Sequence, residues 1–212
     1  MRVVETKVYT YDELDDAAKA KAREWYAGLV FSDNNDWDHV FDDAVRMAET
    51  LGIDIDTKSV KLMGGGTRLE HVIYFSGFWS QGDGACFEGS YRYKKGAAKA
   101  IREEAPEDKE LHRIADALQA VQRRHFYKLR ATTSHRGHYC HSGCMSVDVE
   151  HDDDCYRDIG DAEDDIAQLM RDFADWIYDQ LQKEYDYQMS DEQVAESIIA
   201  NEYEFTEDGA LA

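Results

Sequence analysis

The sequence predicts a single α+β domain over residues 1–212, with an antiparallel sheet built around a central aromatic hairpin and helices packed mainly on one face. The hairpin is predicted from residues 74–93, YFSGFWSQGDGACFEGSYRY, in which two aromatic-rich runs flank a Gln-Gly-Asp-Gly turn. Aromatic residues favour strands, and glycine next to aspartate favours a chain reversal. Helical and extended patterns elsewhere do not alternate as regular βαβ units, which counts against a doubly wound parallel sheet.

The N-terminal third is predicted to hold two helices. A strand over residues 3–10 leads into a helix that begins at a capping box formed by Thr10 and Glu13. A second helix follows Asp36 and ends at Gly52, because glycine commonly terminates helices. Apolar residues recur at helical spacing in both helices: Leu14, Ala18, Trp25 and Leu29 in the first, and Trp37, Val40, Phe41, Ala44, Ala48 and Leu51 in the second.

Two more helices and two strands are predicted after the hairpin. Residues 94–105 form a short basic helix that ends at Pro106, and residues 108–126 form a longer amphipathic helix. Residues 127–133 and 145–149 alternate apolar and polar side chains, which predicts two antiparallel strands added to the hairpin.

The last quarter begins with an acidic loop over residues 151–165. A long helix is predicted from there to about Gln188, and Ser190 caps a short final helix. The tail over residues 201–209, NEYEFTEDG, is predicted to be a closing edge strand.

Charge is the strongest compositional signal, since 45 Asp and Glu against 24 Lys and Arg give a net charge of -21. Residues 92–130 hold 11 basic and 6 acidic residues, a net of +5, so the rest of the chain carries -26. Repulsion then disfavours duplex DNA or an anionic membrane as a direct partner. A basic protein, or a protein that normally holds nucleic acid, is the expected partner. The alternative is a salt-adapted or highly soluble protein whose acidity has no partner.

The lack of targeting signals and the cysteine content predict a cytoplasmic protein. We find no apolar run near the roughly 18 residues of a membrane span and no apolar core of a secretory signal. The four cysteines are predicted to be free thiols or ligands rather than a disulfide framework, because a chain of this size does not need one.

One hypothesis is catalytic and depends on two loops meeting. The hairpin turn presents Gln81 and Asp83, and the connection SHRGHYCHSGC contains Arg136, His138 and His141. A carboxylate from Asp83 could orient either imidazole for proton transfer, while the arginine holds an anionic group. This would give a hydrolase or metal-assisted enzyme acting on an anionic or nucleotide substrate. The alternative is that Asp83 only hydrogen-bonds its own turn.

A metal site in the same connection is the weaker hypothesis. The spacing H-x-C-H-x-x-C, from His138 to Cys144, lacks the paired C-x-x-C of common structural zinc sites. We therefore predict neither a metal nor another cofactor.

The other hypothesis is binding through acidic surfaces. Carboxylates displayed at spacings of several ångströms can imitate a phosphate backbone and occupy a basic cleft. Gln81 and Arg136 are further candidate contacts from the two loops. The candidate acidic residues are Asp152, Asp153, Asp154, Asp158, Glu163, Asp164 and Asp165. The alternative is a solvated acidic face.

With the segments FSGFWSQGDGACFEG, HYCHSG and NEYEFTEDG, the chain resembles a family of phage and prophage proteins labelled "antitoxin of toxin–antitoxin stability system". The similarity runs from YTYDELDDAAKAKAREWY to the end of the chain. It implies a phage context and an interaction role inside the cell, and it identifies no catalytic residues. We therefore expect an acidic, antitoxin-like or anti-defence binding protein rather than an enzyme. The resemblance implies that its partner is a basic host, defence or toxin protein and that it acts in the cytoplasm of a bacterial host cell.

Overall fold

The computed structural model describes residues 7–32, 37–152 and 159–212. The chain divides into two compact units, a terminal unit of Met1–Trp37 with Gln182–Ala212 and a large unit of Asp38–Leu181. Helices and antiparallel strands coexist in the described chain, which confirms the α+β class. The prediction of a single domain stays a prediction.

The terminal unit brings the two ends of the chain together. Strand β1 (Tyr9–Thr10) pairs antiparallel with β10 (Glu204–Phe205), which confirms the predicted closing strand. The Thr10–Glu13 capping box is present but starts a short 3₁₀ helix, η1 (Tyr11–Glu13). Helices α1 (Asp16–Ser32) and α6 (Asp191–Ala200) complete the unit. Its buried core consists of Tyr11, Leu14, Ala18, Ala22, Val194, Ile198 and Phe205.

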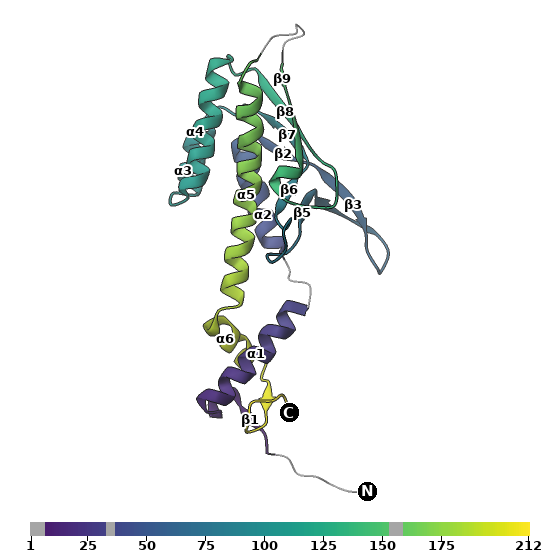
Figure 1. The fold of residues 1–212 in the computed structure, drawn as a ribbon, viewed down its shortest axis with the longest axis vertical. Helices are drawn as coiled ribbons and strands as arrows, with labels where there is room; N and C mark the ends of the chain where they lie inside the picture. The colour runs from purple at the N-terminus through teal and green to yellow at the C-terminus, as the bar shows by residue number, and fades with distance from the viewer. Residues whose placement is uncertain (1–6, 33–36, 153–158) are drawn as a thin grey trace. The chain divides into compact units, whose positions relative to one another are not determined.

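The large unit is built on a four-stranded antiparallel sheet. The strands lie in the order β2 (Ile53–Ile55), β7 (Gly89–Arg92), β8 (Leu129–His135) and β9 (Met145–His151). Helices α2 (Asp38–Leu51), α3 (Ala97–Glu104), α4 (Lys109–Arg124) and α5 (Ala162–Gln188) cover one face of this sheet (Figure 1). The predicted one-sided packing is therefore observed in this unit.

Register decides which side chains of the sheet face the helices. Residues that pair directly across strands share a face, and Tyr91 pairs with Ala131, which in turn pairs with Val149. Tyr91 and Ala131 are buried beneath the helices. The alternate residues of β9, Asp148 and Glu150, are exposed on the opposite face.

The predicted aromatic hairpin is present, with a different ending. Strand β5 (Ile73–Phe75) pairs antiparallel with β6 (Ala85–Phe87) around a connection over 76–84. Beyond Glu88 the chain continues into β7, which joins the four-stranded sheet rather than the hairpin. A second hairpin, β3 (Thr57–Lys61) with β4 (Thr67–His71), encloses the triple glycine.

Helix α5 is fixed to α4 and to the hairpin through its buried face. Asp108 caps α4 by accepting from the Leu111 amide at 2.9 Å, and its other oxygen accepts from the Trp176 indole at 2.7 Å. Phe173 packs edge-on against Phe87 of β6, with ring centroids 5.8 Å apart. These contacts place the middle of α5 beside the β5–β6 hairpin.

Candidate functional site

Two glycine-containing loops of the large unit meet. One is the 76–84 connection of the β5–β6 hairpin, and the other is the 136–144 connection between β8 and β9. A Cβ atom added to Gly82 would lie 2.4 Å from the Tyr139 ring, and one added to Gly84 would lie 2.6 Å from the Cα atom of His141. Such close approach requires glycine at both positions. The loops whose meeting the catalytic hypothesis required are therefore neighbours.

The carboxylate of Asp83 closes its own turn. Its Oδ2 atom accepts hydrogen bonds from the backbone amides of Trp79 at 2.8 Å and Ser80 at 2.6 Å. The Asp83 amide donates in return to the Ser80 carbonyl at 3.0 Å. This is the local hydrogen bonding that aspartate makes in turns. The hydrogen-bond partners of this carboxylate are thus backbone amides rather than an imidazole, and its catalytic role stays a prediction.

The two candidate histidines lie in different surroundings. His138 is exposed and contacts Tyr139 edge-on, with ring centroids 5.7 Å apart. His141 is half-buried, stacks near Tyr139 at 6.4 Å, and has its Nε2 atom 3.4 Å from the Cys144 sulfur. Arg136 and Gln81 are exposed. Among the predicted catalytic residues, His141 therefore has the thiol of Cys144 as a hydrogen-bonding neighbour. The sequence analysis did not pair these two side chains.

Aromatic side chains are displayed on the outer side of the two loops. Trp79 is 73% exposed and Tyr139 is 55% exposed. The backbone of Trp79 is held by Asp83, so the indole projects from a fixed turn. Large exposed aromatic residues are common at the centres of protein interfaces. In the sequence, the feature that could have predicted this exposure is the presence of an aromatic residue within a glycine-rich loop.

Helix α5 brings acidic residues to the same loops, which sequence analysis missed. Burial of its carboxyl group raises the pKa of Asp175, although the residue as a whole remains exposed, and a hydrogen bond with Ser142 opposes this rise. Burial also raises the pKa of Tyr178, with the nearby carboxylates of Asp83 and Asp179 acting in the same direction. No local pattern in the sequence indicates that this turn of α5 reaches residues 141–142.

Three thiols belong to this region. Cys86 is buried and its pKa is raised to about 12, chiefly by that burial. Cys140 and Cys144 are half-buried free thiols. Within the described ranges, no three His, Cys, Asp or Glu side chains are placed to hold a metal ion.

The predicted acidic binding residues fall into three groups. Asp152 pairs with Arg130 at 3.3 Å, and Asp165 pairs with Arg124 at 2.5 Å. Glu163 and Asp164 are exposed in the first turn of α5, where carboxylates favour the positive end of the helix dipole. The remaining candidates, Asp153, Asp154 and Asp158, lie outside the described residues.

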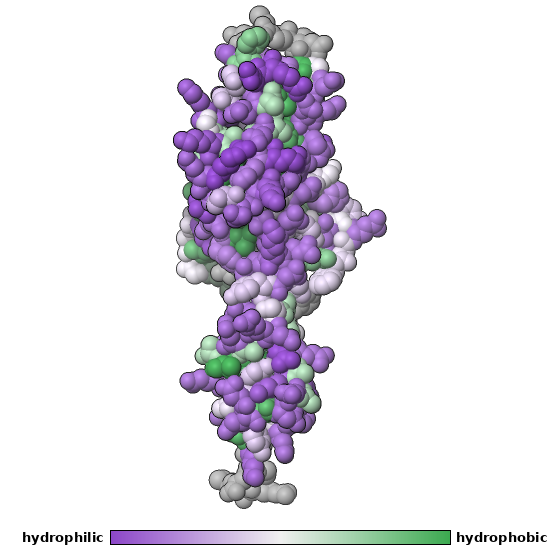
Figure 2. All heavy atoms as spheres, turned by 90° about the vertical axis from the view of Figure 1, so that its left-hand side faces the viewer, coloured by the Kyte–Doolittle hydropathy of each residue, from purple (hydrophilic) through white to green (hydrophobic). Residues whose placement is uncertain are grey.

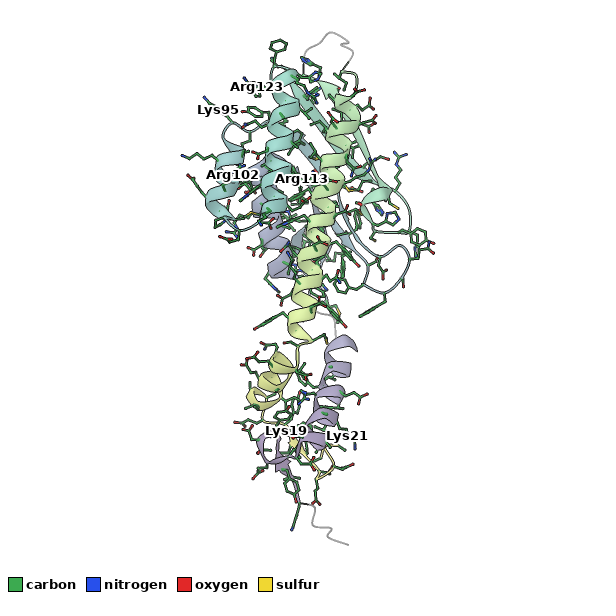
Figure 3. All side chains as sticks on the ribbon, turned by 60° about the vertical axis from the view of Figure 1, so that its left-hand side comes forward. Lys19, Lys21, Lys95, Arg102, Arg113 and Arg123 are labelled. Carbon is green, nitrogen blue, oxygen red and sulfur yellow. The ribbon has the colours of Figure 1, made fainter. Side chains whose placement is uncertain are left out.

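A hollow of about 1190 Å³, with charged side chains on its wall, lies between α4 and α5. Arg113 on its wall contacts Glu110 at 2.6 Å and Asp172 at 2.5 Å, and these carboxylates raise its pKa. Figure 3 shows Arg113 and Arg123 on this side of the large unit, with Arg102 and Lys95 at α3. Figure 2 shows that the surface here is mainly hydrophilic, with small separate hydrophobic patches. Arg113 on the wall of the hollow is therefore already paired with two carboxylates of the protein.

Comparison with known families adds one identification. Residues 37–191 match the Domain of unknown function (DUF8835). The chain belongs to this family. The matched region contains the whole large unit and both loops of the candidate site, whereas most of the terminal unit lies outside it. No curated protein and no solved structure matches the chain. Across the described helices, none is long and apolar enough to cross a bilayer.

Proposed function

We propose that this protein is a non-enzymatic binding protein that occupies a basic surface of another protein, in the manner of an antitoxin-like or anti-defence protein of phage. The observation that carries the proposal is the acidic segment, residues 148–165, with ten carboxylates and one arginine. A local excess of this size exceeds what solubility requires and favours encounter with a cationic partner.

The geometry of the acidic segment supports its exposure to a partner. Asp148 and Glu150 occupy alternate positions of β9 on the face away from the helices, Asp152 follows directly after the strand, and all three are exposed. Alternate residues of a strand lie roughly 7 Å apart, so the carboxylates form a row. Duplex DNA carries one charge per about 1.7 Å of its axis, so this row is a sparser array. We therefore expect the partner to be attracted by the electrostatic field of the whole acidic segment. The row of carboxylates is too sparse to reproduce the phosphate spacing of a DNA strand.

Neutralisation within the protein is partial. Arg130 contacts Glu150 at 3.0 Å as well as Asp152, and Arg124 contacts Asp165. Exposed pairs of this kind contribute little to stability, about 0–1 kcal/mol each, so a partner can displace them at small cost. Together with Arg157, these arginines still leave the ten carboxylates in excess.

Two matched variants test the proposal. The first replaces four exposed carboxylates of the acidic segment: Asp148→Asn, Glu150→Gln, Glu163→Gln and Asp164→Asn. The control replaces four exposed carboxylates of the terminal unit: Glu24→Gln, Glu196→Gln, Glu202→Gln and Glu207→Gln. Each set changes the net charge from -21 to -17.

The experiment captures partners from a bacterial lysate at low and high salt and then measures association rates with the purified partner. We expect salt-sensitive capture of a basic protein, and association at least about tenfold slower for the first variant than for the control. Equal rates for the two variants would remove the acidic segment from the interface. Failure to capture any salt-sensitive partner would count against the proposed function itself.

A further inference from the structure

The imidazole of His141 faces the thiol of Cys144. The Nε2 and Sγ atoms are 3.4 Å apart. The two residues are separated by one turn of the 3₁₀ helix η2 (Ser142–Cys144), which brings residues three apart onto one side. A thiol next to an imidazole is the arrangement in which a base activates a nucleophile.

Glycines on both sides fix the orientation of His141. A Cβ atom at Gly143 would come within 3.0 Å of the Nδ1 atom, so the ring lies against bare backbone there. Gly84 of the other loop approaches the Cα and Cβ atoms of His141 from a different direction. The backbone and Cβ atom of His141 are therefore packed against the other loop, while its imidazole lies against Gly143 of its own loop.

A carboxylate of α5 belongs to the surroundings of this imidazole. Asp175 hydrogen-bonds with Ser142 and interacts electrostatically with His141. The imidazolium that forms when Nε2 takes the proton of the thiol would therefore have this carboxylate as a neighbour.

The other two described thiols provide contrasts. Cys86 is completely buried, and its pKa of about 12 keeps it protonated at neutral pH. Cys140 is half-buried like Cys144, but the imidazole hydrogen bond is made by Cys144. Cys140 and Cys144 thus have similar exposure on one loop, but it is Cys144 that has the imidazole of His141 beside its sulfur.

We propose that Cys144 and His141 form a nucleophilic thiol site that reacts with disulfides of low-molecular-weight thiols. His141 Nε2 takes the proton of Cys144, and the sulfur attacks one sulfur of the disulfide. A new bond forms between that sulfur and Cys144 while the original sulfur–sulfur bond breaks. The released thiolate takes the proton back from His141, so the products are a mixed disulfide on Cys144 and one free thiol.

The site is independent of the acidic segment proposed to bind a partner. Its position gives the reaction a structural consequence, because Tyr139 and Gly82 are in contact beside it. A group attached to the Cys144 sulfur must fit where the two loops meet, so modification is expected to alter the display of Tyr139. The two proposals are tested separately, so a negative result for partner binding does not affect the test of thiol exchange, and the reverse also holds.

The test measures exchange of each cysteine with the neutral disulfide 4,4'-dithiodipyridine in the full-length protein at pH 7, with each site quantified by peptide mass spectrometry. A neutral reagent avoids repulsion by the protein's net charge of -21. We expect Cys144 to react at least about tenfold faster than Cys140. Cys86 serves as an internal control, because it should react only when the fold opens.

The variant His141→Gln keeps a hydrogen-bonding side chain but has no base for the proton. It should lower the Cys144 rate to about that of Cys140 and leave the rates of Cys140 and Cys86 unchanged. In the unmodified protein, the Cys144 rate should fall less between pH 8 and pH 6 than the Cys140 rate, a difference that simple exposure would not produce. Equal rates and equal pH profiles for Cys144 and Cys140 would overturn the proposal without any variant.

Discussion

Gly82 and Tyr139 belong to different loops and lie in direct contact, with the glycine at φ +127° and its missing Cβ only 2.4 Å from the Tyr139 ring. The contact joins the β5–β6 connection to the β8–β9 connection. Because both the backbone angle and the available space disfavour a larger residue, glycine at this position permits the two loops to meet here, as Gly84 does against His141.

We expect Gly82→Ala to destabilise the large unit by about 2 kcal/mol or more, since it adds backbone strain and a clash with Tyr139. Urea unfolding measures the loss. Gly64→Ala is the control, because nothing lies within 4 Å of its added Cβ. It should change stability by less than about 0.5 kcal/mol. If the two variants were equally stable, the loops would not touch in solution.

Asp83 provides a second test, because its local hydrogen bonds separate a structural role from a catalytic one. Asp83→Ala loses the acceptor for two amides and should lower the free energy of unfolding by about 1–2 kcal/mol. Asp83→Asn keeps one side-chain oxygen and should lose about half as much or less. A different outcome would favour the catalytic hypothesis: the natural protein catalyses a reaction, and Asp83→Asn folds normally but loses that activity. This result would reject a purely structural role for Asp83.

Gln122 is the buried polar residue whose removal should be most costly. It is completely buried, donates to the Leu129 carbonyl at 2.7 Å and accepts from the Leu129 amide at 3.2 Å, which ties α4 to the start of β8. Gln122→Ala should cost about 3 kcal/mol, because it creates a cavity and leaves two backbone groups without partners. Gln119→Ala, on the exposed face of the same helix, should be nearly neutral. Amide exchange of Leu129 checks the mechanism, since its protection should fall in the first variant alone.

Lys21 and Asp208 predict the pH dependence of the terminal unit. Their side chains are 2.6 Å apart, and hydrogen bonds from Lys21 and Thr206 lower the pKa of Asp208 from 3.8 to about 2. Because the pKa is lower in the folded state, the stabilising contribution is complete above the unfolded value of 3.8. It is lost as the pH falls from there through about 2.

Nuclear magnetic resonance titration of the Asp208 carboxyl carbon measures this pKa directly. Lys21→Met should return it towards 3.8, and added salt should do so in part because the pair is exposed. A titration near 3.8 in the natural protein would show that the ion pair does not form in solution.

Local signals account for the elements that sequence analysis predicted well. The Asp108 cap, the apolar stripe of α4 and the Ser190 cap of α6 each depend on residues within a few positions of one another. The predicted helix over 108–126 ends earlier, at Arg124, because Phe126 and Tyr127 adopt positive φ angles that reverse the chain into β8. Positive φ at two aromatic residues has no sequence signal.

The sequence by itself therefore determined the α+β class, most helices, the β5–β6 hairpin and the concentration of charge in the acidic segment, because periodicity, capping and composition are local properties. Only the tertiary structure decided that Gly82 meets Tyr139, that Gly84 meets His141, and that Asp175 reaches Ser142. These contacts depend on the register of strands far apart in the chain, and a shift of one residue would turn the same side chains to the other face.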